Sequence, residues 1–491
     1  MPQLRDSGTR AAHEAGATPA AELDGFGRIF GVETEYGVSV TGADRPVDAG
    51  QVAMTMFRPV VSRARSTNTY LDNGSRLYLD VGSHPEYATA EARDPMDALA
   101  QDAAGERVMA SLAADAQSKL RASHGEGAVI HVFKNNVDSA GHAFGCHENY
   151  LVRRFVPLET IERQLLPFLI TRQLYTGAGR FTPDGFQITQ RADFLDEAVS
   201  SATTRSRPMV NTRDEPHADP ESFRRLHVII GDSNRSQWAT WMKLAVTHLV
   251  LCVIEDAVRH GRPSGFEDLA FADPAAANRA VSRWLGPGER GASDGAGADP
   301  AGTPDPLSMQ RRYLDVVEAF VRERHDDIDA SLPKTGVDDV IASWRWALDA
   351  LERRDFAALS TRVDWAAKHC LAEALRRRRP DTDLARLEQL ELDYHDVANG
   401  RLYASLVAHG RLGEPLDAAT VAAAKHEPPS DTRAALRGAF VRRALDTGAQ
   451  FSCDWTTMVV SSPVRREAVL LDPFSCEPTE QYRALMDSMR A

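Results

Sequence analysis

Acidic side chains recur at two-residue spacing near the start of the sequence. In RIFGVETEYGV, residues 28–38, apolar residues alternate with others, and Glu33 and Glu35 stand two positions apart. Side chains two apart on a β-strand point to the same face of its sheet. A strand here therefore presents both carboxylates on one surface. Two interpretations follow: the carboxylates meet water on a solvated sheet face, or they hold a metal ion.

The segment RLYLD repeats the alternation and adds other functional groups. Arg76, Tyr78 and Asp80 share one strand face, and Glu86 follows after the turn GSHP. Two adjacent strands then present several carboxylates, a phenol and a guanidinium together. Carboxylates that close repel one another unless a cation neutralises them. Mg²⁺ takes oxygen ligands and leaves positions for phosphate oxygens, so the combined pattern keeps a magnesium site and a solvated face equally open.

Two histidines and a tryptophan each admit two interpretations. His147 in GCHENY and His227 in RLHV are either hydrogen-bonded core residues or metal ligands. Trp455 in CDWTT either packs in the core or provides a surface on which a base stacks. None of these residues decides the matter alone.

A polar block at residues 200–219 contains closely spaced arginines. Arg205, Arg207 and Arg213 lie within SSATTRSRPMVNTRDEPHAD. Arginine binds carboxylate and phosphate through two parallel hydrogen bonds, which favours an anion site. The alternative is a solvated loop in which the arginines pair with Asp214 and Glu215.

The composition excludes several classes of protein. The chain has 491 residues, 43% of them hydrophobic, and a formal net charge of −13, so it is not a general nucleic-acid binder. Five separated cysteines without a CxxC pair indicate reduced thiols in a cytosol. The N-terminus lacks a secretory signal. The longest apolar run, residues 244–254, is too short to span a bilayer and predicts a buried core helix.

Strands and helices alternate in the first part of the chain. The patterns predict strands from Arg28 and over residues 75–81, 86–92, 128–136, 148–154 and 225–234. Asp94 and Pro95 predict the start of a long helix, and further helices are expected over 236–260 and 308–378, the latter with packed tryptophans. In this part of the chain no glycine-rich phosphate loop follows a predicted strand, so neither of the two common nucleotide-binding signatures, GxGxxG and GxxxxGK[ST], is present there.

Composition also divides the chain. We expect a disordered leader at 1–26, a catalytic domain over 27–425 with a flexible Gly/Pro-rich insertion at 286–306, and a small α+β domain over 426–491. Ser430 or Asp431 is the expected cap of a helix through TRAALRGAFVRRAL.

Several long blocks, taken in order, resemble the Pup ligase family. They are GVETEYG, NGSRLYLDVGSHPEYATAE, FKNNVDSAGHAFGCHENY, SSATTRSRP, NTRDEPHAD, RRLHVIIGDSN and the late DW, which together extend from about residue 28 to 480. Pup is the small prokaryotic ubiquitin-like protein that marks bacterial proteins for the proteasome. The family is similar to glutamine synthetase and the γ-glutamyl-cysteine ligases. The leader and the 286–306 segment lie outside the resemblance, and Cys453 stands where an apolar residue is expected.

The resemblance implies an α+β fold. A large domain would contain a curved, mostly antiparallel sheet backed by helices, as in glutamine synthetase, and a small C-terminal α+β domain would pack against it. The concave face would hold ATP and Mg²⁺. By motif, the resemblance implies that Glu33, Tyr78 and Glu86 bind magnesium, with Glu35, His147 and His227 as further members of that shell. It implies that Arg76, Thr89 and Trp455 bind ATP and that Asp80 is the catalytic base. Arg205, Arg207 and Arg213 would bind the carboxylates of Pup or the transferred phosphate.

The implied reaction joins two proteins. ATP would phosphorylate the γ-carboxylate of the C-terminal glutamate of Pup, and a lysine of a target protein would then displace the phosphate. Pup, acidic and partly disordered, would fold as it binds a groove on the ligase. The protein would be a cytoplasmic monomer without nucleic-acid or membrane partners. The alternatives are the sister enzyme that deamidates Pup and removes it from substrates, a ligase for small molecules, and a non-catalytic adaptor.

Overall fold

The computed structural model describes residues 25–80, 82–138, 141, 143–200, 207–285 and 305–489. At its centre is an eight-stranded sheet with the order β10-β11-β12-β7-β1-β5-β4-β3. The pairing of β10 with β11 is parallel, and the other pairings of this sheet are antiparallel. The expected mostly antiparallel sheet in an α+β fold is therefore confirmed. Its strands are β1 (Phe30–Glu35), β3 (Asn68–Tyr70), β4 (Arg76–Leu79), β5 (Pro85–Ala88), β7 (Cys146–Arg153), β10 (Glu197–Ser200), β11 (Pro208–Asn211) and β12 (Phe223–Val228).

Strand β1 lies between β5 and β7, and its alternating sequence sorts its side chains between the two faces. Phe30, Val32 and Thr34 are buried against the helices, whereas Glu33 and Glu35 point to the other face. The register opposes Glu33 to Ala88 of β5 and His147 of β7, and opposes Glu35 to Glu86. Outside this sheet, β2 (Gly37–Thr41) pairs with β6 (Val129–Phe133), and β8 (Arg180–Thr182) pairs with β9 (Gly185–Gln187).

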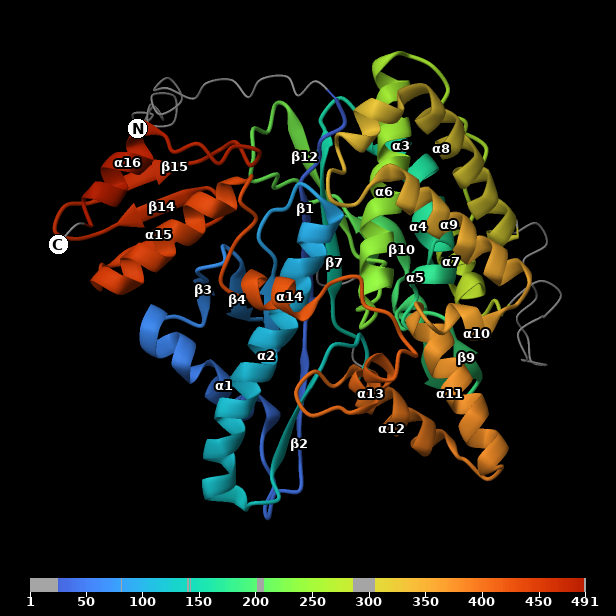
Figure 1. The fold of residues 1–491 in the computed structure, drawn as a ribbon, viewed down its shortest axis with the longest axis horizontal. Coiled ribbons are helices and arrows are strands. Elements are labelled where there is room, and N and C mark those ends of the chain that lie inside the picture. The colour runs from blue at the N-terminus through green and yellow to red at the C-terminus, as the bar shows by residue number, and fades with distance from the viewer. Residues whose placement is uncertain are drawn as a thin grey trace, which may run out of the picture.

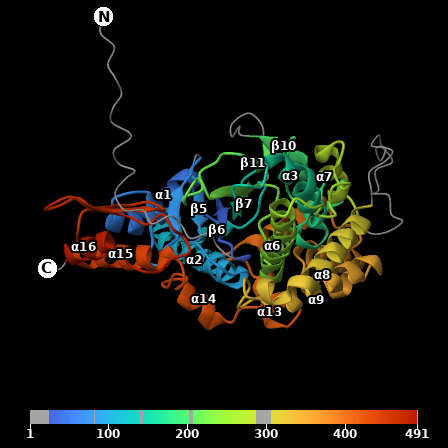
Figure 2. The same ribbon diagram turned by 90° about the horizontal axis from the view of Figure 1, so that it is seen from above.

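Helices cover one side of the sheet, and the main hydrophobic core lies between the two layers (Figures 1 and 2). Two long helices begin where side-chain caps occur. Asp94 accepts a hydrogen bond from the Met96 amide at 2.8 Å at the start of α2 (Pro95–His124), as the sequence predicts. Ser236 caps α6 (Gln237–Arg259), in which every residue from 244 to 254 is buried. Among the described residues, no helix has the length and apolarity needed to cross a membrane.

The helices expected over 308–378 are present, and their tryptophans pack as predicted. Trp344 and Trp365 are fully buried, while the ring of Trp346 lies 5.5 Å from that of Trp238. The remaining helices of the large unit are α1 (Ala49–Ala64), α3 (Leu158–Thr160), α4 (Leu166–Thr171), α5 (Gln173–Thr176), α7 (Pro274–Ser282), α8 (Pro306–Asp329), α9 (Val337–Glu352), α10 (Phe356–Leu359), α11 (Asp364–Arg378), α12 (Leu384–His395), α13 (Leu402–Ala408) and α14 (Ala418–Ala424).

The C-terminal elements form a separate small unit at one end of the molecule (Figure 1, red). A three-stranded sheet packs with two helices around its own core, which includes Phe440, Met458 and Leu485. These elements are α15 (Arg433–Thr447), β13 (Phe451–Cys453), β14 (Thr457–Val460), β15 (Arg466–Val469) and α16 (Glu480–Asp487).

The cap of α15 differs from the prediction. Thr432, rather than Ser430 or Asp431, accepts the hydrogen bond from the Ala434 amide, at 3.3 Å. The reason is that the helix begins at Arg433, one residue later than predicted. The Thr432 hydroxyl also donates a hydrogen bond to the Glu91 carbonyl of the large unit.

The two expected flexible segments fall mainly on parts of the chain that lie outside the described residues, 1–24 and 286–304. Their edges belong to the folded core. Phe26, which we placed in the leader, is buried with its ring 5.6 Å from that of Phe320. Pro306, which we placed in the insertion, is the first residue of α8.

Candidate functional site

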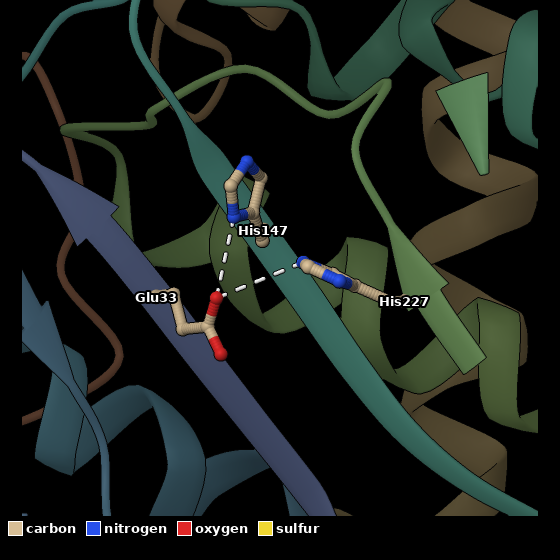
Figure 3. Close-up of side chains that lie close together, drawn as sticks. All are labelled: Glu33, His147 and His227. Carbon is tan, nitrogen blue, oxygen red and sulfur yellow. Dashed lines mark hydrogen bonds and ion pairs between the residues drawn. The ribbon is translucent and has the colours of Figure 1, made fainter. Parts of the chain in front are cut away.

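Two groups of possible metal ligands lie on the sheet face opposite the helices. The first consists of Glu33 on β1, His147 on β7 and His227 on β12 (Figure 3). The Glu33 Oε2 atom lies 3.2 Å from His147 Nδ1 and 3.7 Å from His227 Nε2. The two imidazole rings meet edge to face, with centroids 4.8 Å apart. Both histidines thus lie beside the same carboxylate, as the metal-ligand interpretation requires.

The second group consists of Glu35, Asp80 and Glu86. Each offers a carboxylate oxygen, and these oxygens all lie within 4.8 Å of one another. Glu35 also accepts a hydrogen bond from the Gly145 amide. Tyr78 is opposite Glu86 in the β4–β5 register. The expected magnesium shell is therefore divided between two neighbouring groups, and Asp80 belongs to the second.

The electrostatics of the second group are unfavourable for the isolated protein. Burial raises the pKa of Glu86 well above its usual range, and the nearby charges of Glu33 and Glu35 raise it further. Burial and the charges of Glu86 and Glu33 likewise raise the pKa of the Tyr78 phenol. Among the residues that the structure describes, no lysine or arginine forms an ion pair with Glu35, Asp80 or Glu86. A cation placed among these oxygens would offset the repulsion.

In the first group, positive neighbours stabilise the carboxylate. Burial alone would raise the pKa of Glu33, but the hydrogen bond with His147 and the positive charges around it hold that pKa well below its usual range. Burial lowers the pKa of His227 to about 3, so its imidazole is neutral near pH 7. The Nε2 atom of His227 is buried without a hydrogen-bond partner. A neutral, unpartnered imidazole nitrogen beside a carboxylate is suited to metal coordination.

The two groups offer different donor atoms. Three carboxylates suit a hard cation such as Mg²⁺, whereas two imidazoles and one carboxylate also suit Mn²⁺ or Zn²⁺. Both donor sets therefore fit divalent cations, and the carboxylate group fits Mg²⁺ on its chemistry alone.

A pocket that is partly open to solvent adjoins the first group on the same face. Gly31 lines this pocket, and a Cβ atom at that position would lie 3.8 Å from Thr89 Oγ1 and from Asn149 Cβ, at ordinary contact distance. The Thr89 hydroxyl accepts a hydrogen bond from the Val32 amide at 3.0 Å. The small C-terminal unit supplies part of the wall. The lining residues are Ile29, Phe30, Gly31, Val32, Glu33, Ala88, Thr89, Glu91, Asn149, Tyr150, Leu151, Pro216, His217, Arg225, Arg433, Trp455 and Pro473.

Of the three expected nucleotide contacts, two line this pocket and one does not. Thr89 and Trp455 are in its wall. Arg76 is not among the lining residues; its Nε donates to Asn68 Oδ1 at 2.9 Å, and its guanidinium lies 4.2 Å from the centre of the Tyr78 ring. Arg76 is thereby held beside the second metal group.

The three arginines expected to bind anions differ in their surroundings. Arg205 lies outside the described residues. The Arg213 side chain is 61% exposed and pairs with Glu215 at 2.7 Å. This arrangement fits the alternative interpretation, a solvated loop in which the arginines pair with neighbouring carboxylates. Arg207 is exposed, and its charge is near enough to contribute to lowering the pKa of buried Arg191.

Four basic residues at this face are not among the site residues predicted from the sequence. Arg225 Nη1 lies 3.5 Å from Glu33 Oε1, and Arg225, His217 and Arg433 line the pocket. Arg191 is buried, and Glu35 is among the charges that act on it. Only Arg225 had a local signal, because it stands two residues before His227 on a strand and must share its face.

Known proteins resemble this chain over most of its length. The sequence model of the Pup-ligase protein family matches residues 28–459. The Pup–protein ligase of Bifidobacterium longum (strain NCC 2705) is 71% identical over 489 residues, covering 100% of both chains. The Pup–protein ligase of Bifidobacterium adolescentis is 60% identical over 491 residues, again covering 100% of both chains.

Two solved structures share the fold. One is the crystal structure of the complex between the prokaryotic ubiquitin-like protein Pup and its ligase PafA, with a TM-score of 0.82, 35% identity, and coverage of 94% of this chain and 92% of that chain. The other is the Pup ligase PafA in complex with ADP, with a TM-score of 0.75, 36% identity, and coverage of 91% and 94%. The family expected from the quoted motifs is confirmed: the chain belongs to the Pup-ligase protein family.

Proposed function

We propose that this protein is an ATP-dependent ligase that joins the C-terminal glutamate of Pup to lysine side chains of target proteins. One observation carries the proposal: two groups of possible metal ligands lie on a single sheet face, and the first of them adjoins a pocket whose wall includes Trp455. Its relatives are named Pup–protein ligases, and the solved structures of PafA contain Pup or ADP. The combination supports a nucleotide-dependent reaction at this face.

The pocket holds the nucleotide, and the two metal groups face its phosphates. Thr89 and Trp455, which both line the pocket, contact the nucleotide, while Glu33 belongs both to the pocket lining and to the first metal group. Glu33, His147 and His227 would hold one Mg²⁺ ion, and Glu35 and Glu86 with Tyr78 would hold another, beside Asp80. The ions, when bound, offset negative charge on the phosphate oxygens during transfer.

The first chemical step activates a carboxylate. The γ-carboxylate of the C-terminal glutamate of Pup attacks the γ-phosphorus of ATP, forming a bond between its oxygen and phosphorus as the bond to the bridging oxygen of ADP breaks. Arg76 stabilises the charge that moves to the phosphate oxygens. Arg207, and Arg205 and Arg213 with it, bind the carboxylates of Pup. The products of this step are an acyl phosphate and ADP.

The second step forms the isopeptide bond. A free lysine has a pKa of about 10.4, so its amine is protonated near pH 7 and must lose a proton before it attacks. Asp80 accepts that proton, and the neighbouring carboxylates of Glu35 and Glu86 attract the incoming ammonium. The amine nitrogen then attacks the acyl carbon, and phosphate leaves with the bonding electrons.

A set of parallel incubations tests the proposal. The protein is incubated with Mg·ATP, Pup ending in glutamate and a lysine-bearing protein; a covalent conjugate with release of ADP is the expected result. If instead Pup ending in glutamine is converted to glutamate and no conjugate forms, the protein is the deamidating sister enzyme. If ADP is released with free glutamate and a small amine but without Pup, it is a small-molecule ligase. If ATP is bound but unchanged in every mixture, the protein is an adaptor.

A further inference from the structure

Glu91 lies at the junction between the large sheet and the small C-terminal unit. It follows β5, two residues after Thr89, and it lines the same pocket. Its Oε1 accepts hydrogen bonds from Arg433 Nε at 2.7 Å and from Arg437 Nη1 at 3.0 Å, and Arg437 also donates to its Oε2. Glu91, Arg433 and Arg437 are only 7%, 2% and 0% exposed. One carboxylate thus binds two guanidinium groups away from solvent.

Arg437 connects this carboxylate to Trp455. Its Nη1 donates to the Trp455 carbonyl at 3.0 Å, and its guanidinium lies 4.9 Å from the centre of the Trp455 ring. The same guanidinium donates to the Gly74 carbonyl at 2.9 and 3.0 Å, which fixes it to the β3–β4 turn of the large unit. Tyr70 completes the arrangement, with its ring edge to face with Trp455 at 5.2 Å.

Arg433 connects the carboxylate to a different part of the small unit. Its Nη1 donates to the carbonyls of Leu470 and Leu471 at 3.1 and 3.2 Å. The preceding residue, Thr432, donates from its hydroxyl to the Glu91 carbonyl at 3.1 Å. Glu91 therefore receives contacts from the start of α15 through both its side chain and its backbone.

Such a buried group of charges is sensitive to the loss of any member. Two buried guanidiniums share one carboxylate, and removing that carboxylate leaves positive charges in a poorly solvated place. The apolar core of the small unit would still hold its own helices and strands together. The position of Trp455 relative to the sheet depends on directional contacts, which Arg437 makes with both units.

We infer that Glu91 is a positioning residue for nucleotide binding: it orients Arg437 and Arg433, and Arg437 holds Trp455 against the pocket that Thr89 and Gly31 line. This inference rests on the proposed function, because it takes that pocket as the nucleotide site. Glu91 makes its contribution through Trp455 and not through chemistry at the phosphates.

The experiment compares Glu91→Gln, Trp455→Ala and the double variant in the full chain. Glu91→Gln should raise the KM for ATP and the Kd for ADP about tenfold, the loss expected when one stacked aromatic contact with a base is misplaced. The kcat at saturating ATP should stay within about twofold of the unsubstituted protein. Since both substitutions act through the same contact, the double variant should bind ADP no more than about twofold more weakly than Trp455→Ala alone. Glu467→Gln, which removes an exposed ion pair with Arg465 in the same unit, is the matched control and should change neither constant.

The outcomes separate this inference from the proposed function. If Trp455→Ala binds ADP normally, the nucleotide pocket itself is misassigned. If Trp455→Ala weakens ADP binding and the effect of Glu91→Gln adds to it in full, the positioning role is overturned while the pocket stands. A fall in melting temperature with an unchanged KM for ATP also overturns it, because a merely structural residue gives that result. If Glu91→Gln does not fold, Arg437→Lys keeps the charge, removes the forked contact and should give the same rise in KM; an unchanged KM in that variant overturns the inference.

Discussion

Glu33 and His147 are direct partners across the antiparallel pair β1–β7, and the Oε2 atom of Glu33 lies 3.2 Å from Nδ1 of His147. Their contact is therefore fixed by strand register rather than by a flexible loop. Of the described residues, Glu33 is the one that both faces the pocket and belongs to a group of possible metal ligands.

Replacing Glu33 with glutamine should abolish the first metal site. The amide keeps the size of the side chain and loses the negative charge that a divalent cation requires. We expect Mn²⁺ affinity in the presence of ADP, and the rate of conjugation, to fall by about 100-fold or more. Metal titration monitored by calorimetry measures the first quantity. Glu197→Gln, an exposed residue of the same sheet, is the control, and equal metal affinity in the two variants would remove Glu33 from the site.

Metal removal should have opposite consequences for the protein and for its Glu86→Gln variant. In EDTA the repulsion among Glu35, Asp80 and Glu86 is uncompensated, and a neutral amide relieves part of it. Glu86→Gln should therefore melt about 2 °C higher than the unsubstituted protein in EDTA, and should lose most of the rise in melting temperature that Mg²⁺ produces. Thermal unfolding with and without Mg²⁺ measures both effects. A variant less stable than the unsubstituted protein in EDTA would contradict this account of the carboxylates.

Asp80→Asn should lower the rate of conjugation by about 10²–10⁴-fold at pH 7, the usual contribution of a general base. The deprotonated fraction of an ordinary lysine, with a pKa near 10.4, rises about 100-fold between pH 7 and pH 9. The variant should therefore regain activity steeply over this interval, whereas the parent protein should gain little. Asp196→Asn serves as an exposed control. Recovery with excess Mg²⁺ instead of higher pH would identify Asp80 as a metal ligand alone.

The ion pairs of Glu91 with Arg433 and Arg437 predict that the folded protein loses stability at acid pH. Burial would raise the pKa of Glu91, but Arg437 and Arg433 outweigh it and lower that pKa from 4.5 to about 2. A carboxylate with a lowered pKa in the folded state contributes stability above its unfolded pKa and loses it as the pH falls through the folded value. The difference corresponds to about 3 kcal/mol, lost between about pH 4.5 and pH 2. Urea unfolding across this range should show the loss, and Glu91→Gln should be less stable at pH 7 and lack this component.

Gly31→Val should obstruct the pocket without disturbing the strand. Valine suits a β-strand, and a Cβ atom at this position meets Thr89 and Asn149 at ordinary contact distance. We expect ADP binding to weaken at least about tenfold, which is the effect of losing one base-stacking contact. The melting temperature should change by less than about 2 °C. Gly27→Val, where no atom lies within 4 Å of the added Cβ, is the control. Normal ADP affinity in Gly31→Val would place the nucleotide elsewhere.

Local patterns in the sequence were sufficient for the elements that carry the site. Alternation on β1 and β4 put Glu33 with Glu35 and Arg76 with Tyr78 on common faces, and Asp94 marked the start of α2. These features depend only on neighbours in the chain, which is why they could be read without a structure.

Other features depend on contacts between distant segments and left no local signal. The division of the acidic residues into two groups follows from the order β7-β1-β5-β4, which spacing alone does not reveal. Arg433 resembles any other basic residue of an amphipathic helix until the fold places it against Glu91, which is 342 positions earlier in the chain. The cap at Thr432 was missed for the same reason, since its hydroxyl also bonds to the large unit.

Because Glu33 and Glu35 belong to different groups of possible metal ligands yet are separated by one residue of the same central strand, the distance between their Cα atoms is set by the covalent repeat of an extended backbone. Rotation of the side chains moves the carboxylates but leaves this backbone separation unchanged. Differences in the size or charge of the reacting groups must then be accommodated by the surrounding loops, such as the one that carries Asp80, while the backbone of the strand keeps its geometry.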